Sequence, residues 1–450
     1  MTVKAAAWKA TEALVSFVVE TPAGRVPAAA LASGRKVLLD TIGVTLAASG
    51  RPIGEIISRY VGESSNAPGT ASVIGARGIR TSAPLAALAN GTLSNALDYD
   101  EGFHVATHVV PAALALTEHA GGSGRDLLDA IVVGYEAGAK LTRAIDVGRT
   151  EQRGPTPRGW WHVGLVGPLA AACVASRLLR LDKKKTATAI GIATCSSGGF
   201  RRTMGTMAKG LHSGNAARDG LQAAFLAERG FTADAEILEA PLGFFHAIVA
   251  EEDRDPTAIA GLGKPYELEK APGIKCIPAC TPGHAMIETV LAAYAKARRP
   301  LDDIERVEAD LHTFSLNRAE PEDEDQAGFS GAYLTAAALV FGKVGLDEVT
   351  EEAIHDARVK ALMKRVKHMP SAKKGTERVV IRFRDGSEVV AEGSNRPRRL
   401  VTDEEIAAKF RDCAGRVLSP KAVAEIEARV ARLEQEASVE PLMAAAGGRL

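Results

Sequence analysis

Hydrophobic residues recur at every third or fourth position over most of the chain up to Gly263, as they do in helices that bury one face. Ser123 precedes one such stretch and Asp126 follows three residues later, a combination typical of a helix start. A short strand is expected only near residues 71–74. The spacing predicts helices over residues 25–49, 84–97, 126–145, 163–181, 186–194, 215–229 and 242–249, and another that begins at Pro111.

The pattern changes after Gly263, where an extended segment rich in proline leads to residues that alternate in polarity. Strands are expected over residues 304–314 and in a hairpin whose turn is Arg384-Asp385-Gly386. Helices are expected over residues 281–298, 331–341, 351–366, 403–418 and 421–436. We therefore predict a mainly α protein with a large all-helical domain, residues 1–263, and a smaller α+β lid domain, residues 264–401. The lid is inserted before C-terminal helices, residues 402–450, that pack back on the large domain.

The composition narrows the classes of function. Lys and Arg number 55, as do Asp and Glu, so no strongly basic field is available for a nucleic acid. The five cysteines are odd in number and scattered, which indicates a reducing compartment. We find no signal peptide and no uninterrupted apolar run of about 18 residues. We expect a cytoplasmic protein that binds neither nucleic acid nor membrane.

One short stretch concentrates titratable groups between apolar, small-residue flanks. Residues 95–108, NALDYDEGFHVATH, carry three carboxylates and two histidines: Asp98, Asp100, Glu101, His104 and His108. Burying so many ionisable groups costs free energy, which is more often tolerated at a functional site than in a scaffold. The alternative is a solvated acidic loop with two surface histidines. For the stretch as a whole we favour function.

Three other glycine-containing connections also carry ionisable groups. They are residues 159–162 with His162, residues 200–212 with Arg201, Arg202, Lys209 and His212, and residues 273–284 with Lys275, Cys280 and His284. Cations bind carboxylates as charge-assisted partners, and histidines transfer protons, so the combination suits an anionic substrate. The prediction depends on the four connections meeting in one cleft between the large domain and the lid.

Metal and cofactor motifs are weak. Cys276 and Cys280 have CxxxC spacing with no third cysteine nearby, which is a poor zinc or iron–sulfur signature. Residues 205–210, GTMAKG, lack the GK[ST] ending of a phosphate loop. We expect no metal and no cofactor.

Several motifs together resemble the MmgE/PrpD family. They are NALDYDEGFHVATH, SGRDLLDAIVVGYE, GWWHVGLVGPLAAA, GTMAKGLHSGNAARDGLQAAFLAERGF, KCIPACTPGH and FSGAYLTAAALVFG, and they span roughly residues 30–345. The resemblance implies a helical domain with an α+β lid, a homodimer, and a cofactor-independent site between the domains. Residues that match the family's site are Asp98, His108, His162, Lys209, Lys275 and Tyr333. Tyr333 is implied by the resemblance alone.

This sequence departs from the family pattern at three places that bear on the reaction. Gly102 replaces a common threonine, and Cys280 stands where the decarboxylase branch carries a histidine, so both argue against cis-aconitate decarboxylation. Arg201 resembles the branch that contains an iminodisuccinate epimerase. Dehydration of a small di- or tricarboxylate, as by 2-methylcitrate dehydratase, is therefore our first hypothesis. Epimerisation, decarboxylation and non-catalytic carboxylate binding are the alternatives.

The expected roles follow from proton abstraction next to a carboxylate, which needs a base, an acid and fixed cations. The catalytic group is expected to be His108, His162, Tyr333 and Asp98, and the substrate-binding group Lys209, Lys275, Arg201, Cys280, His104 and His212.

Overall fold

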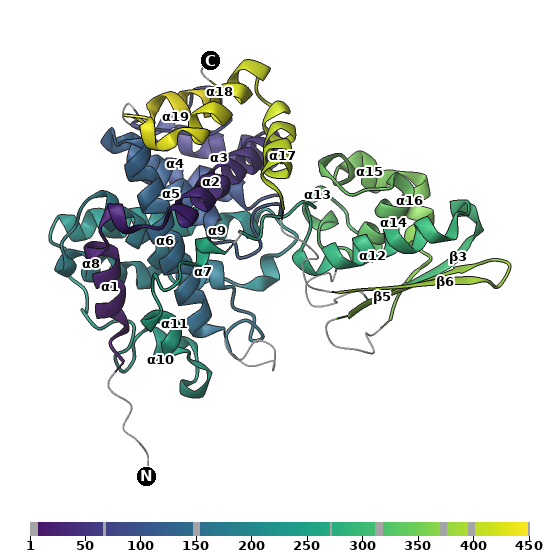
Figure 1. Ribbon diagram of the computed structural model, residues 1–450, viewed down its shortest axis with the longest axis horizontal. Coiled ribbons are helices and arrows are strands. Elements are labelled where there is room, and N and C mark those ends of the chain that lie inside the picture. The colour runs from purple at the N-terminus through teal and green to yellow at the C-terminus, as the bar shows by residue number, and fades with distance from the viewer. Residues whose placement is uncertain are drawn as a thin grey trace, which may run out of the picture.

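The structure is a computed structural model that describes residues 8–65, 69–146, 154–270, 272–310, 318–369, 376–394 and 401–448. A helical body and a smaller part with a sheet lie side by side, with α17 near the region between them (Figure 1). The predicted mainly α fold with a small sheet towards the C-terminus is confirmed. The predicted domain boundaries at residues 263 and 401 stay predictions. Below, the body denotes α1–α11 with α17–α19, and the lid denotes α12–β6.

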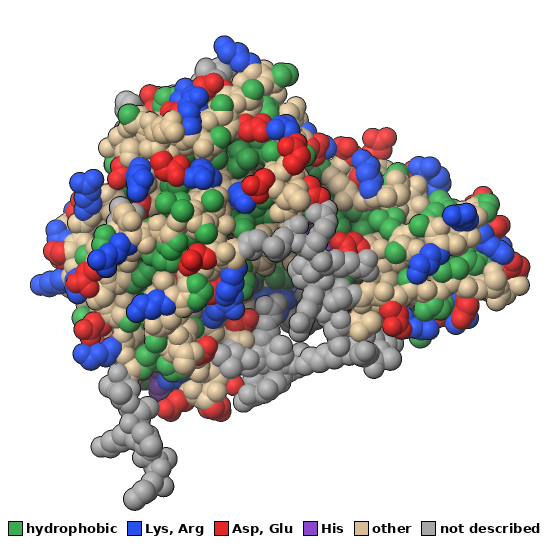
Figure 2. Space-filling model, in the orientation of Figure 1, with side chains coloured by type: hydrophobic (Ala, Val, Ile, Leu, Met, Phe, Trp, Pro, Cys, Tyr) green, Lys and Arg blue, Asp and Glu red, His purple; other side chains and the backbone are tan. Residues whose placement is uncertain are grey.

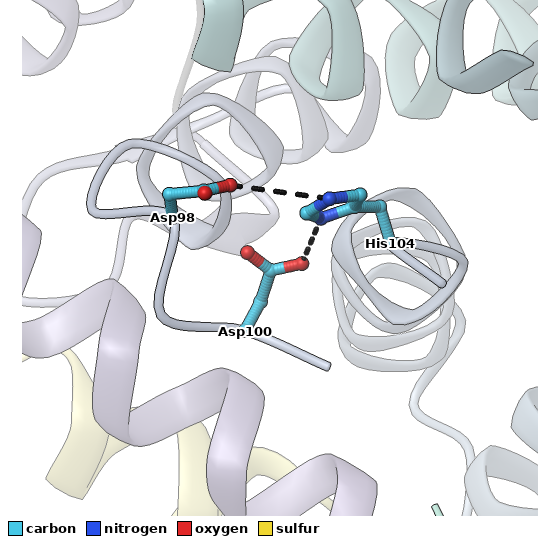
Figure 3. Close-up of side chains that lie close together, drawn as sticks. All are labelled: Asp98, Asp100 and His104. Atoms are coloured by element: carbon cyan, nitrogen blue, oxygen red, sulfur yellow. Dashed lines mark hydrogen bonds and ion pairs between the residues drawn. The ribbon is translucent and has the colours of Figure 1, made fainter. Parts of the chain in front are cut away.

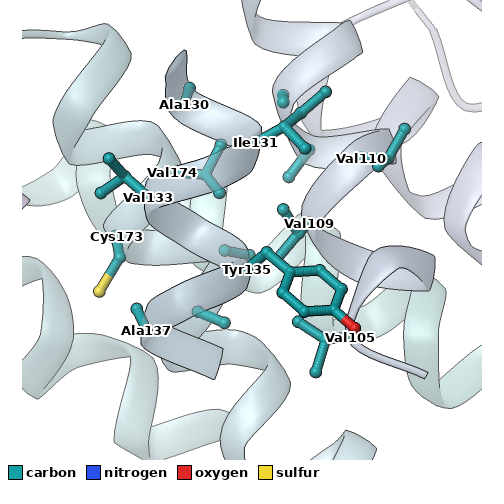
Figure 4. Packing of buried hydrophobic residues seen from close by; sticks show 14 of the residues in the cluster. Val105, Val109, Val110, Ala130, Ile131, Val133, Tyr135, Ala137, Cys173 and Val174 are labelled. Atoms are coloured by element: carbon teal, nitrogen blue, oxygen red, sulfur yellow. The ribbon is translucent and has the colours of Figure 1, made fainter. Parts of the chain in front are cut away.

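The body is built from helices whose small and branched residues pack closely. Its helices are α1 (Ala10–Glu20), α2 (Ala28–Ser49), α3 (Pro52–Glu63), α4 (Ala83–Ser94), α5 (Ala106–Ala120), α6 (Gly124–Ile145), α7 (His162–Leu178), α8 (Lys183–Ala193), α9 (Ala208–Glu228), α10 (Phe244–Ile248) and α11 (Pro256–Ala260). A two-stranded ribbon, β1 (Ala71–Ser72) and β2 (Arg80–Thr81), lies among them. Figure 4 shows α5, α6 and α7 sharing one apolar core that includes Val109, Ile131 and Val174.

Helices α4 and α9 approach one another unusually closely, because glycine lines their contact. A Cβ on Gly214 would lie 2.2 Å from Oγ1 of Thr92 and 2.3 Å from the carbonyl oxygen of Leu88. A Cβ on Gly210 would lie 2.5 Å from the carbonyl oxygen of Thr92. The absence of these two side chains sets the start of α9 against the C-terminal end of α4, where residues 95–104 begin.

The lid packs helices against one four-stranded sheet. Its helices are α12 (Thr281–Ala297), α13 (Glu324–Ala327), α14 (Gly331–Phe341), α15 (Glu351–His355) and α16 (Ala357–Met363), and its strands are β3 (Ile304–Ala309), β4 (Val366–His368), β5 (Thr376–Phe383) and β6 (Glu388–Ser394). The strand order is β4-β3-β5-β6, with β3 and β4 parallel and the other pairs antiparallel. Helices α12 and α14 cover one face of the sheet (Figure 1). The hairpin predicted at Arg384-Asp385-Gly386 is confirmed as β5–β6.

After the lid the chain returns to the body as α17 (Asp403–Gly415), α18 (Pro420–Ala431) and α19 (Glu440–Ala446). Helices α17 and α18 contact α2, and the carbonyl of Ala446 accepts a hydrogen bond from the Gly75 N–H at 2.8 Å. No helix in the described ranges is long and apolar enough to cross a membrane. Acidic and basic side chains are interspersed over the face seen in Figure 2.

Several predicted boundaries are wrong, for identifiable reasons. The predicted loop up to Gly214 already forms the first turns of α9 from Ala208, because the glycines there serve helix packing and do not end the helix. Helix α5 starts at Ala106 and continues through Pro111. Helix α3 and strand β4 were not predicted. The single helix expected over residues 351–366 is divided at Asp356, which caps α16. Residues 311–314 of the predicted strand lie outside the described residues.

Candidate active site

The carboxylate of Asp98 lies where body and lid meet. The residue follows α4 and has a left-handed backbone, with φ of 49°. Its Oδ1 lies 2.7 Å from Nζ of Lys209 in the body and 3.2 Å from Nζ of Lys275 in the segment before α12. All three side chains are buried. Three of the four connections therefore meet at one buried ion cluster.

Backbone pairing brings the segment with Lys275 to this cluster. The N–H of Gly102 donates to the carbonyl of Gly273 at 2.9 Å, and Glu101 pairs with Ile274 in an antiparallel bridge. Lys275 follows directly and also donates to the carbonyl of Asp98 at 3.0 Å. The geometry explains why a residue distant in sequence reaches Asp98.

Lys209 is held by groups of both the body and the lid, on the two sides of the seam where these parts meet. It lies in the first turn of α9 and donates to the carbonyl of Asn95 at 2.9 Å and to its side-chain oxygen at 2.6 Å. The rings of Trp161, from the body, and Phe329, from the lid, lie 5.6 and 5.9 Å from Nζ, within the range of cation–π attraction.

The ion cluster controls the ionisation of its members. Burial alone would raise the pKa of Asp98, but Lys209 and Lys275 outweigh it and hold the pKa well below the ordinary value. Burial opposes the charge on Lys275, yet Asp98 and Asp100 raise its pKa. Asp98 is therefore an ionised carboxylate that balances part of the charge of two buried ammonium groups.

Asp100 and His104 form an oriented pair beside this cluster (Figure 3). Nδ1 of His104 lies 2.6 Å from Oδ2 of Asp100, and Nε2 lies 3.9 Å from Oδ1 of Asp98. Burial opposes ionisation of Asp100, but His104 lowers its pKa. Because the carboxylate accepts the Nδ1 proton, it fixes the orientation of the ring. Glu101 instead accepts backbone N–H groups of Phe103 and Ala106 at the start of α5.

Asp98, Asp100 and His104 could also be considered as metal ligands. Each offers one ligand atom, and these atoms lie within 4.8 Å of one another. However, Lys209 and Lys275 approach the same oxygen of Asp98 and already bring the positive charge that a cation would supply. The donor set therefore fits an ion-paired carboxylate better than a metal centre.

A cavity of about 330 Å³ opens beside the pair and collects residues from all four connections. Its wall includes His104, His162, Arg201 and Cys280, together with Gly102, Phe103, Thr142, Asp146, Thr156, Trp161, Met204, Thr281 and Pro282. Nε2 of His162 lies 3.1 Å from the carbonyl oxygen of Phe103, and its ring centroid is 6.3 Å from that of His104. Two histidines and a guanidinium thus share one water-accessible space.

Backbone pairing holds residues 159–161, which precede His162, against residues 199–201. The backbone N–H of Arg201 donates to the carbonyl of Gly159 at 2.9 Å, and the backbone N–H of Trp161 donates to the carbonyl of Gly199 at 3.1 Å. His212 packs edge-on against Trp161, with ring centroids 5.3 Å apart, and lies behind the wall rather than in it. Burial and Lys209 lower the pKa of His212.

His108 lies in the helical core rather than on the cavity wall. Its side chain is buried, and neither ring nitrogen has a hydrogen-bond partner among the described residues. A Cβ on Gly167 of α7 would lie 3.4 Å from the ring, so α7 packs directly against it. Burial, with a smaller contribution from His104, lowers the pKa of His108 to about 3. The structure therefore separates His108 from the space in which His104 and His162 meet.

Tyr333 also lies away from this cavity. It is buried in the lid core, and its hydroxyl donates to the carbonyl of Glu348 at 2.6 Å. Tyr333 borders a different cavity, of about 470 Å³, which residues 320–322, α15 and α16 also line. Burial raises the pKa of Tyr333. The structure does not bring this residue to the two histidines.

Sequence reasoning assigned no role to several groups at the seam. Asp100 was part of the acidic stretch, and its spacing of four residues from His104 was a usable signal. Asp325 of α13 was not singled out; it borders a small cavity of about 30 Å³ together with Asp98 and Arg51. Burial and neighbouring acids raise the pKa of Asp325 to about 6. No periodicity in the sequence indicates that α13 returns to this point.

Comparison with known proteins identifies the class to which this fold and site belong. The MmgE/PrpD N-terminal domain matches residues 12–257, and the MmgE/PrpD C-terminal domain matches residues 277–435. The chain belongs to the MmgE/PrpD family of enzymes.

Its curated relatives are similar along most of their length. A cis-aconitate decarboxylase of Mus musculus is 28% identical over 427 residues, which cover 89% of this chain and 86% of that protein. A cis-aconitate decarboxylase-like protein of Aspergillus oryzae is 30% identical, with 98% of each chain covered. The cis-aconitate decarboxylase of Homo sapiens is 26% identical, with 94% of this chain and 92% of that protein covered.

Proposed function

We propose that this protein is a cofactor-independent lyase that removes carbon dioxide from a small unsaturated polycarboxylate of the cis-aconitate kind. The observation that carries the proposal is the cavity in which His104, oriented by Asp100, shares a wall with His162 and Arg201. Relatives named as cis-aconitate decarboxylases support this reaction over the dehydration that sequence reasoning placed first.

The proposed chemistry needs one proton donor and fixed positive charge. Loss of carbon dioxide from a saturated carbon next to an alkene leaves an electron pair that forms a new double bond to the central carbon. The original double bond opens, and its outer carbon takes one proton. His162 or His104 supplies this proton, since both reach the cavity, while Arg201 holds a carboxylate that stays.

The buried lysines contribute to the same charge balance. Lys209 and Lys275 offset the carboxylates of Asp98 and Asp100, so that the guanidinium of Arg201 supplies positive charge at the cavity wall. Such a fixed charge favours an anionic substrate and the negative charge that develops when the double bond shifts. Cation and carboxylate are held before the substrate binds, so little reorganisation is needed during the reaction.

Dehydration remains the second candidate. Cys280 and Gly102, the two departures from the family pattern that argue against decarboxylation, both border the cavity. Both reactions use a proton-transferring histidine and cationic carboxylate partners, and they differ in the group that leaves.

The homodimer implied by the resemblance is also a proposal. Light scattering during size-exclusion chromatography measures the oligomeric state directly.

The test is a panel of cis-aconitate-like, 2-methylcitrate-like and succinate-like acids followed by proton NMR and carbon dioxide detection. Decarboxylation predicts one carbon dioxide per substrate and new terminal alkene protons, whereas dehydration predicts alkene protons without carbon dioxide. Incorporation of deuterium from D₂O without net turnover would indicate epimerisation. No reaction or exchange with any acid contradicts the enzyme proposal and favours a binding protein.

A matched pair of variants tests the histidine assignment. His162→Gln removes a cavity histidine and should lower kcat by ~10²–10⁴-fold, the range of a positioned acid or base. His119→Gln changes a histidine at the far end of α5, where it contacts Thr70, and should leave kcat unchanged. Equal activity in the two variants would exclude His162 as the proton donor.

A further inference from the structure

Helix α17, which follows the lid, reaches the back of the candidate active site. It lies along α2, where Gly43 allows close approach: a Cβ there would be 3.1 Å from the ring of Phe410 and 3.3 Å from its Cα. The neighbouring Lys409 therefore points between the two helices, and its side chain is almost completely buried.

The ammonium group of Lys409 has a defined set of partners. It forms an ion pair with Asp40 of α2 at 2.6 Å, and it donates to the carbonyl of Tyr99 at 2.5 Å. It also lies 3.9 Å from the centroid of the Tyr99 ring. Burial raises the pKa of Asp40, and Lys409 opposes that shift. A buried ion pair by itself is weak evidence of a stabilising role.

The position of Tyr99 gives this contact its significance. Tyr99 stands between Asp98, which binds the two lysines, and Asp100, which orients His104. Its hydroxyl donates to the carbonyl of Cys276 at 3.4 Å, next to Lys275. The left-handed backbone at Asp98 is unfavourable for a non-glycine residue, so surrounding contacts must hold it. Lys409 supplies such a contact at the next peptide.

We propose that Lys409 is a positioning residue for the candidate active site: its ammonium group fixes the Tyr99 carbonyl and thereby the directions of the Asp98 and Asp100 side chains. The inference rests on the proposed function, because its effect is measured on the reaction at His104. A helix that follows the lid in sequence thus supports residues 98–104 from behind. Lys409 itself is not among the described residues that line the cavity.

The test removes the hydrogen-bond donor without leaving a buried charge. The double variant Asp40→Asn with Lys409→Met replaces the ion pair by neutral groups of similar size, so the fold is expected to be retained. We expect kcat to fall at least 10-fold and KM to change less than 3-fold, because Arg201 keeps its place while Asp100 no longer holds His104.

A second double variant keeps a neutral donor. Asp40→Asn with Lys409→Gln leaves an amide N–H that can donate to the Tyr99 carbonyl, so it should recover part of the lost kcat. The matched control is Lys36→Met with Asp403→Asn, a surface ion pair of 2.6 Å between the same two helices that does not contact Tyr99. The control should leave kcat unchanged.

The outcomes separate the two proposals. If the unaltered protein turns over none of the acids, the proposed function fails, and the positioning role, which is defined on that reaction, is overturned with it. If the unaltered protein is active and the methionine double variant, folded by circular dichroism, keeps its kcat, the positioning role is wrong. Equal losses in the methionine and glutamine variants would also overturn it, because the donor would then be irrelevant.

Discussion

Replacing Asp98 by asparagine tests the ion cluster directly. The side chain keeps its size but loses the charge that balances Lys209 and Lys275, which lie 2.7 and 3.2 Å away and are buried. Removing one partner of a buried ion pair typically costs ~3–5 kcal/mol, because the remaining charge has no compensation. Tm should therefore fall; each kcal/mol lowers Tm by roughly 2–4 °C for domains of about 150–250 residues, and by less in this chain of 450 residues.

The pH dependence gives this prediction a second readout. Since the folded-state pKa of Asp98 is depressed, its stabilisation is present above the unfolded pKa near 4 and is lost as the pH falls below that value. The difference in free energy of unfolding between the protein and Asp98→Asn should therefore shrink on acidification. Urea denaturation followed by circular dichroism at several pH values measures it.

The control is a surface ion pair across the same seam. Asp347 of the lid lies 2.7 Å from Arg416 of α17, but 64% of its side chain is exposed. Solvent screens such a pair, so Asp347→Asn should cost less than about 1 kcal/mol. If Asp98→Asn costs no more than this control, the reasoning about uncompensated lysines is refuted. Adding Lys275→Met to Asp98→Asn should recover part of the loss.

Three further predictions concern other residues. Asp100→Asn replaces the charged acceptor for Nδ1 of His104 by a neutral amide, and it should lower kcat by ~10²–10⁴-fold without unfolding the protein, as steady-state kinetics and circular dichroism can show. In the unaltered protein the free energy of unfolding should fall between about pH 6.5 and 3 by up to about 1.4 kcal/mol per pH unit, because the unfolded state takes up a proton that the buried His108 ring resists. His108→Met should make this fall less steep. An unchanged slope of the free energy of unfolding against pH would contradict the burial of His108. Gly214→Ala should lower Tm by several degrees, because the added Cβ meets Thr92 at 2.2 Å and overpacking costs about 1–3 kcal/mol or more.

The fold class follows from local pattern in the sequence, because helix periodicity, the Ser123 cap and the hairpin turn are local signals. Boundaries fail where tertiary contacts decide. Gly210 and Gly214 read as a loop, yet they allow α9 to pack on α4. Lys209 consequently lies in a helix, and its direction towards Asp98 is set by that packing rather than by a flexible connection.

The candidate site shows the same limit. The grouping of charged residues in the sequence predicts a site between body and lid, and Asp98, Lys209 and Lys275 do lie together there. Sequence alone cannot tell which of the two histidines faces the cavity. His104 precedes α5 with a left-handed backbone, φ of 59°, and lines the cavity, whereas His108 lies within α5 and is buried in the core. Long-range partners, such as Lys409 behind Tyr99, leave no local pattern at all.

The return of α17, α18 and α19 to the body has a consequence for biosynthesis. The surface of α2 that α17 and α18 contact stays uncovered until the ribosome has made the whole lid. We expect nascent chains that stop before α17 to expose apolar surface and to recruit chaperones. The inserted part, which has its own apolar core, can meanwhile reach its final form.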